Sequence, residues 1–141
     1  MFLIQFWIVH VLFQIIMNVR LSQHFTLDEF CNTSHPQYQD DVVAFDYVCN
    51  MQKLCTLVLE PLRRYLGSPV CISSGYRSPR LNDEVGGVFN SAHLTGRAAD
   101  IPCSSLSLQV KIYDFLKSHV PPVKCVLKEH KNGVMWIHVN I

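Results

Sequence analysis

The sequence carries little charge: Lys, Arg, Asp and Glu make up 16% of its 141 residues, against about 25% in an average soluble domain. Twelve basic and eleven acidic residues leave a net charge of +1. Such a chain has no positive field to hold a phosphate backbone, so a nucleic-acid-binding function is not expected. The chain is 49% hydrophobic, and with so few charges this composition excludes a disordered chain or a coiled coil. The length suits one domain with its own core.

The six cysteines form no CxxC pair and no zinc-finger spacing, which excludes a cysteine-based structural zinc site. Four of them, Cys49, Cys55, Cys71 and Cys125, lie in apolar runs, where a free thiol behaves as a small hydrophobe. We therefore expect buried, reduced thiols. The even number would also permit disulfides if the protein is exported.

Residues 1–19 carry no formal charge, but they lack the basic start and the small-residue cleavage site of a secretory signal. A membrane-spanning helix needs about 20 mostly apolar residues, and this segment is borderline in length and interrupted by polar side chains. Because a soluble-looking N-terminus follows Met17, three interpretations stay open: a start assigned too early, a membrane anchor, or an atypical signal. Residues 20–141 are expected to form the functional domain.

Two helices are predicted in the first half of the chain. Thr26 to Glu29 form a capping box, with Phe25 and Phe30 at the positions of a hydrophobic staple, so a short helix begins there. Between residues 40 and 66 apolar side chains recur every three or four residues, which predicts one buried helix face. Pro61 is expected to kink or divide that helix.

The second half combines strand and helix signals. We expect a helix over 106–120, capped by Ser104 or Ser105. An Asn-Gly pair at 132–133 between two apolar runs is typical of a hairpin. The expected strands are 70–72, 98–101, 123–129 and 135–141. This order predicts an α+β domain with a small, mostly antiparallel sheet and flanking helices.

His93, Asp100 and His138 are the candidate metal ligands. The turn at Gly96 lets a loop histidine and a strand carboxylate face one point. In the last strand the apolar residues alternate with His138, so its imidazole should lie on the opposite face from them. Two imidazoles and a carboxylate suit a catalytic Zn²⁺ with water as the fourth ligand. The alternative is that some of the seven histidines lie near an aspartate by accident.

Several motifs carry a family resemblance. Ser91 to Asp100 match the pattern Ser-x-His-x-x-Gly-x-Ala-x-Asp, which is the signature of the zinc D-Ala-D-Ala carboxypeptidases. This group is the A-type branch of peptidase family M15, and phage endolysins share it. Three further segments are similar to the same family and occur in the same order: residues 21–30, 74–88 and 136–139. The resemblance covers about residues 21–141, and linked motifs are more specific than any single one.

The resemblance implies a hedgehog/DD-peptidase-like fold and a zinc peptidase that hydrolyses peptidoglycan stem peptides. Its zinc ligands would be His93, Asp100 and His138. The bond cut would be that of a D-Ala-D-Ala carboxypeptidase or of an L-Ala–D-Glu type endopeptidase. We expect a monomer acting at the bacterial cell wall, as a phage or prophage lysis enzyme or as an exported or anchored one. The alternative is a non-catalytic, zinc-containing module of the same fold that binds the wall or a partner.

Five further residues receive roles from the resemblance. Arg77 would bind the substrate, since a guanidinium holds a carboxylate through two parallel hydrogen bonds. Ser91 would orient the first ligand or bind substrate, and Trp136 would form a wall of the cleft. We expect Glu129 to be the general base, with His130 as the second candidate. The position three residues before the last ligand, acidic in some relatives, is not acidic in this chain.

Overall fold

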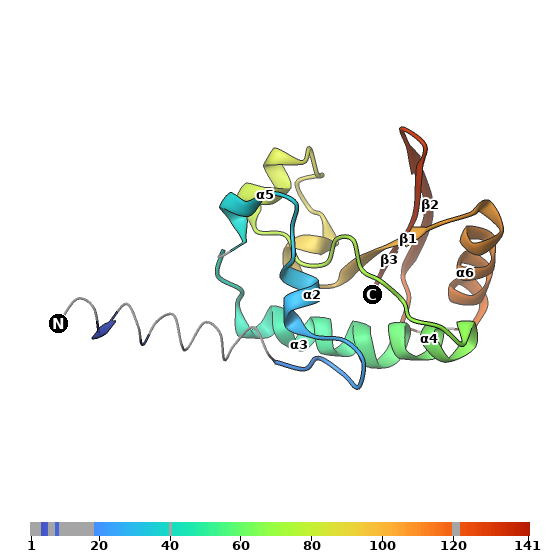
Figure 1. Ribbon diagram of the computed structural model, residues 1–141, viewed down its shortest axis with the longest axis horizontal. Coiled ribbons are helices and arrows are strands. Elements are labelled where there is room, and N and C mark those ends of the chain that lie inside the picture. Colours follow the sequence, from blue (N-terminus) through green and yellow to red (C-terminus); the bar gives the residue numbers. More distant parts are fainter. Residues whose placement is uncertain (1–3, 6–7, 9–18, 40, 120–121) are drawn as a thin grey trace.

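The computed structural model describes residues 4–5, 8, 19–39, 41–119 and 122–141 (Figure 1). The interpretations of residues 1–19 as anchor, signal or wrongly assigned start therefore fall almost entirely outside the described residues. Within the described part of the chain, no helix is both long enough and apolar enough to cross a membrane.

The short N-terminal helix α2 (Leu27–Cys31) begins as predicted. The Thr26 side chain accepts from the Glu29 amide, and the Glu29 carboxylate accepts from the Thr26 amide at 2.8 Å. Phe25 and Phe30 are almost fully buried, as staple residues should be. A short 3₁₀ turn, η1 (Pro36–Tyr38), follows.

A long helical segment runs along one side of the molecule (Figure 1). It consists of α3 (Phe45–Leu54), a π-helical stretch η2 (Cys55–Leu59) and α4 (Glu60–Leu66). The helix begins at Phe45 rather than near residue 40. Pro61 lies in the first turn of α4, where its missing N–H leaves no broken bond, and the hydrogen-bond pattern changes just before it. Pro61 is expected from the sequence to kink or divide the helix; the helical run continues through it, with a π-helical stretch directly before α4.

The sheet has three antiparallel strands in the order β1-β3-β2: β1 (Ala98–Cys103), β2 (Cys125–Lys131) and β3 (Val134–Asn140). Asn132 and Gly133 close the β2–β3 hairpin with φ angles of 52° and 78°, as the Asn-Gly pair predicts. Helix α6 (Leu106–His119) joins β1 to β2 and packs on the sheet. Its cap is Ser105, whose hydroxyl accepts from the Leu108 amide. The α+β class with an antiparallel sheet is confirmed.

The predicted strand at 70–72 does not form. In the described residues this segment pairs with β1 through one isolated bridge, Ser74 to Asp100, and then turns toward α2, where the Tyr76 amide donates to the Phe30 carbonyl at 2.7 Å. Three short helices are not among the predicted elements: η1, α5 (Pro79–Glu84) and η3 (Ala92–Thr95). They are too short to show a helical period.

The two faces of the sheet differ in chemistry. Residues directly opposite in an antiparallel pair share a face. One face carries the buried Ile101, Val126, Ile137 and Val139, which join the core with Ile112 and Leu116 of α6. The other face carries Asp100 opposite His138, and Glu129 opposite Trp136. The sheet therefore separates the hydrophobic core from the polar candidate site.

All six cysteines are free. Cys55 and Cys103 are buried, and burial raises the pKa of the Cys55 thiol far above its ordinary value. Burial and the nearby Asp28 raise the pKa of Cys31 to about 12. Of the four cysteines expected to be buried, only Cys55 is: Cys49 and Cys125 are half-buried, and Cys71, without a strand at 70–72, lies exposed on the surface.

Candidate metal centre

The structure brings His93, Asp100 and His138 together, from η3, β1 and β3 respectively. Each residue offers one ligand atom, and these atoms all lie within 4.8 Å of one another. Asp100 Oδ1 is the common point, 2.9 Å from His138 Nδ1 and 3.2 Å from His93 Nε2. The three residues expected to form one site from their spacing thus converge on one point.

The short helix η3 places His93. Ser91 is its N-cap, and the Ser91 hydroxyl accepts from the His93 amide. Gly96 ends the turn with a φ of 68°, which favours glycine. A side chain at Gly96 would also collide with α3, because its Cβ would lie 2.6 Å from the Tyr47 carbonyl oxygen. The close contact between this turn and α3 therefore sets the position of the first ligand.

The two ring nitrogens of His93 have different surroundings. Nδ1 lies 2.6 Å from the Gly75 carbonyl, which can only accept, so Nδ1 carries the proton. Nε2 is consequently the unprotonated nitrogen. It is buried and has no hydrogen-bond partner among the described residues, although Asp100 Oδ1 is near. A buried lone pair beside a carboxylate oxygen is what a metal ion would satisfy.

Asp100 is held from its other side by Arg77. Arg77 Nη2 donates to Asp100 Oδ2 at 2.9 Å, and Arg77 Nε donates to the Ser74 hydroxyl at 2.9 Å. Burial raises the pKa of Asp100, but the imidazoles of His138 and His93 and the charge of Arg77 outweigh it and hold the pKa far below its ordinary value. The carboxylate is therefore ionised and ready to bind a cation.

The side chains of His93, Asp100 and His138 are suited to bind a metal ion. Two imidazole nitrogens and one carboxylate oxygen form a donor set that zinc accepts, and three protein ligands leave a position open for catalysis. Each ligand is also fixed by a neighbour on its far side: the Gly75 carbonyl for His93, Arg77 for Asp100, and Asn140 for His138. Such outer partners are typical of metal sites.

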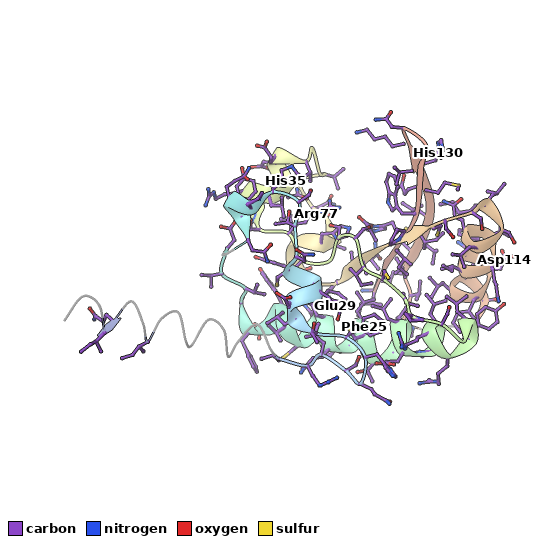
Figure 2. All side chains as sticks on the ribbon, in the orientation of Figure 1. Phe25, Glu29, His35, Arg77, Asp114 and His130 are labelled. Atoms are coloured by element: carbon purple, nitrogen blue, oxygen red, sulfur yellow. The ribbon has the colours of Figure 1, made fainter. Side chains whose placement is uncertain are left out.

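The three ligands lie in an open cleft of about 520 Å³. Four of the five other predicted site residues also line it: Arg77, Ser91, Glu129 and Trp136. On the sheet, Glu129 is the diagonal neighbour of His138, so the two side chains share one face and one cleft. His130 lies on the opposite face, exposed, and Figure 2 shows it on the hairpin far from Arg77. The structure does not bring His130 to the cleft.

Two buried side chains shape the cleft without a role in the sequence prediction. Gln109 of α6 donates to the carbonyls of Glu129 and Trp136, at 3.0 and 2.9 Å, and so ties the strand pair whose side chains face the cleft. Asn82 donates to the Val88 carbonyl and fixes the loop on the other rim. Buried polar side chains among apolar ones give no pattern by which a sequence reveals their partners.

Fold and site together define a small α+β protein with a candidate metal centre in an open cleft. The family model described as Peptidase M15 matches residues 23–140. The chain therefore belongs to the peptidase M15 family and is a peptidase, with a peptide as its substrate and a site of the metallopeptidase kind. No match was found among curated proteins. The matched range includes all three candidate ligands and Glu129.

Proposed function

We propose that residues 20–141 form a zinc-dependent peptidase domain that hydrolyses peptidoglycan stem peptides at the bacterial cell wall. The ligands are His93, Asp100 and His138. The observation that carries the proposal is the convergence of three ligand atoms, one of them a buried nitrogen without a partner, in an open cleft of a peptidase-family chain.

A zinc ion held by these residues would polarise the scissile carbonyl and make a water nucleophilic near neutral pH. The chain must then supply a base. Glu129 is proposed for this role because, among the residues that line the cleft, it is the only carboxylate besides Asp100. It takes the proton of the attacking water and returns it to the leaving amine, so the proton count is unchanged.

Arg77 is proposed to serve both the ligand and the substrate. Its Nε and Nη2 are occupied by Ser74 and Asp100, whereas Nη1 has no partner among the described residues. Nη1 is therefore the donor left for a substrate oxygen. Arg77 is also the only Lys or Arg among the residues that line the cleft. Nη1 can donate either to a terminal carboxylate or to an internal carbonyl. This donor therefore suits a carboxypeptidase and an endopeptidase equally.

The test is to incubate the full chain with purified peptidoglycan and identify the products by mass spectrometry. Loss of single alanine residues would establish a carboxypeptidase, and release of stem peptides an endopeptidase. Activity should vanish with a chelator and return with zinc. A folded, zinc-loaded protein that releases nothing from several wall types would contradict the proposal and favour a binding module.

The base is tested separately. Glu129→Gln should lower kcat about 10²–10⁴-fold while the bound zinc stays stoichiometric. His130→Gln, the matched control on the next residue, should keep wild-type activity because its side chain lies on the other face of the sheet. Equal losses in both variants would exclude Glu129 as a specific base.

A further inference from the structure

Asn140 contacts the third candidate ligand. It lies two residues after His138 on β3, so both side chains are on the face of the sheet that forms the cleft. The Asn140 side-chain nitrogen is 3.3 Å from His138 Nε2. Its main chain is fixed, because the Asn140 carbonyl accepts from the Lys124 amide at 2.9 Å. The position of this amide is thus set by the sheet.

Two contacts of the His138 ring bear on its tautomer. Nδ1 faces the ionised Asp100 Oδ1 at 2.9 Å, and Nε2 faces the amide nitrogen of Asn140. A carboxylate only accepts and an amide nitrogen only donates. In this arrangement, therefore, the neutral ring carries its proton on Nδ1 and offers its lone pair at Nε2.

Metal binding requires the other tautomer. The nitrogen that lies with the other ligand atoms is Nδ1, which must present a lone pair to an ion. The single proton of the neutral ring then sits on Nε2 and needs an acceptor. A half turn of the Asn140 amide about its Cβ–Cγ bond exchanges Nδ2 for Oδ1, which can accept that proton.

We propose that Asn140 is a positioning residue that serves both tautomers of His138: its amide donates to Nε2 without metal, and accepts from Nε2–H when Nδ1 binds the ion. The proton leaves Nδ1 and one is taken up at Nε2, so the ring stays neutral. The inference rests on the metal centre of the proposed function.

The contrast with His93 supports this assignment. The partner of the His93 ring is a main-chain carbonyl, which accepts only, so that His93 is held in the metal-ready tautomer at all times. The partner of the His138 ring is a side-chain amide, which can serve in either sense. The His93 ring is already in the tautomer that binds the ion, whereas the His138 ring changes its tautomer when the ion binds.

Nitrogen-15 NMR of the histidine-labelled full chain tests the two states directly. In metal-free protein we expect His138 to carry its proton on Nδ1, and in zinc-loaded protein on Nε2. A zinc-loaded protein in which Nε2 is unprotonated and bound to the ion would overturn the proposal. This measurement uses the unaltered chain and does not depend on how any variant folds.

Zinc affinity, measured by competition with a chelator, tests the role of the amide. Asn140→Leu removes both functions and should weaken zinc binding about 10–100-fold. Asn140→Asp can only accept, which presets the metal-ready tautomer, so zinc should bind more tightly than in the wild type. The control is Asn90→Leu, since Asn90 lines the same cleft and no hydrogen bond joins it to the three ligands in the described part of the chain.

An Asn140→Leu variant with the affinity of Asn90→Leu would exclude this role for Asn140 while leaving the metal centre intact. A wild-type chain that binds no zinc at all would instead refute the proposed function. The two failures are therefore distinguishable.

Discussion

At the scale of single residues, Asp100 is the common contact of the candidate metal centre. One of its oxygens faces both imidazoles and the other is held by Arg77. Replacement of Arg77 is therefore expected to change the direction in which the Asp100 carboxylate points. Arg77 is expected from the sequence to bind substrate, and in the structure it also holds the Asp100 carboxylate in place.

Arg77→Lys tests that support. Lysine keeps the charge but loses the planar fork that bonds Ser74 and Asp100 at once. Zinc affinity should fall at least about tenfold, measured by chelator competition. A variant whose KM rises while its zinc affinity is unchanged would show that Arg77 acts on the substrate alone.

The sequence could predict the ligands but only part of their surroundings. His93, Asp100 and His138 have side-chain types and spacings that suit a metal, and the structure brings them together. The Gly75 carbonyl could not be predicted, because a main-chain atom has no residue signature. Asn140 could have been found from its two-residue spacing to His138 on a strand.

At the scale of elements, a carboxylate of the long helix fixes the N-terminal segment. Glu60 accepts from the Ser22 hydroxyl at 2.7 Å and the His24 amide at 2.8 Å, and it pairs with His24 Nδ1 at 2.8 Å. Burial raises the pKa of Glu60, but these hydrogen bonds outweigh it and leave the pKa below 4.5. The folded state therefore favours the ionised form.

This pair predicts a pH-dependent stability. A carboxylate with a lowered pKa stabilises the fold fully above its unfolded value of 4.5 and loses that contribution as the pH falls through the folded pKa. Glu60→Gln should destabilise the protein by about 1.5–3 kcal/mol at pH 7. In urea unfolding, the difference from wild type should shrink as the pH falls below 4.5. Exposed Glu84→Gln is the control, and a difference independent of pH would contradict the prediction.

The turn after η3 gives a second prediction. Gly96→Ala places a side chain in the left-handed region and against the Tyr47 carbonyl. Strain of this kind costs about 1–3 kcal/mol, and the shift of His93 should also weaken zinc binding. Gly67→Ala is the matched control, because Gly67 has a similar φ of 65° but open space around it. Calorimetry and zinc titration of both variants would separate steric contact from backbone strain.

Elements with a local signal were predictable, and those held by tertiary contacts were not. The capping box at Thr26 and the Asn-Gly turn at 132–133 are encoded in a few adjacent residues, and both form. The apolar run at 70–72 has strand composition, but only Ser74 pairs with Asp100. Neighbouring structure overrides such short propensities.

At the scale of the whole molecule, the candidate metal centre joins residues from distant parts of the chain. The three candidate ligands come from η3, the middle of β1 and β3. In the sequence, 45 positions separate His93 from His138 (138 − 93). An ion bound there is bound by the folded state alone. Metal binding should therefore stabilise the entire domain.

Zinc at a free concentration of 100 times its Kd should add about 2.7 kcal/mol to the free energy of unfolding. Thermal unfolding with and without zinc should show a higher Tm with the metal. Asp100→Asn removes the ionised carboxylate at the centre of the cluster, so its Tm should not respond. A zinc-induced rise that persists in this variant would mean that the ion binds elsewhere.

The π-helical stretch between α3 and α4 has a consequence for how this chain tolerates insertion and deletion. A π turn holds one more residue than an α turn, so the side chains beyond it are rotated by about 100° relative to an unbroken α-helix. Met51 before the stretch and Leu62 after it are both fully buried in the core. Many substitutions at the exposed Thr56 would be accepted, whereas removing that residue would turn one half of the helix away from its neighbours. Deletion of this one exposed residue should therefore cost more stability than its substitution.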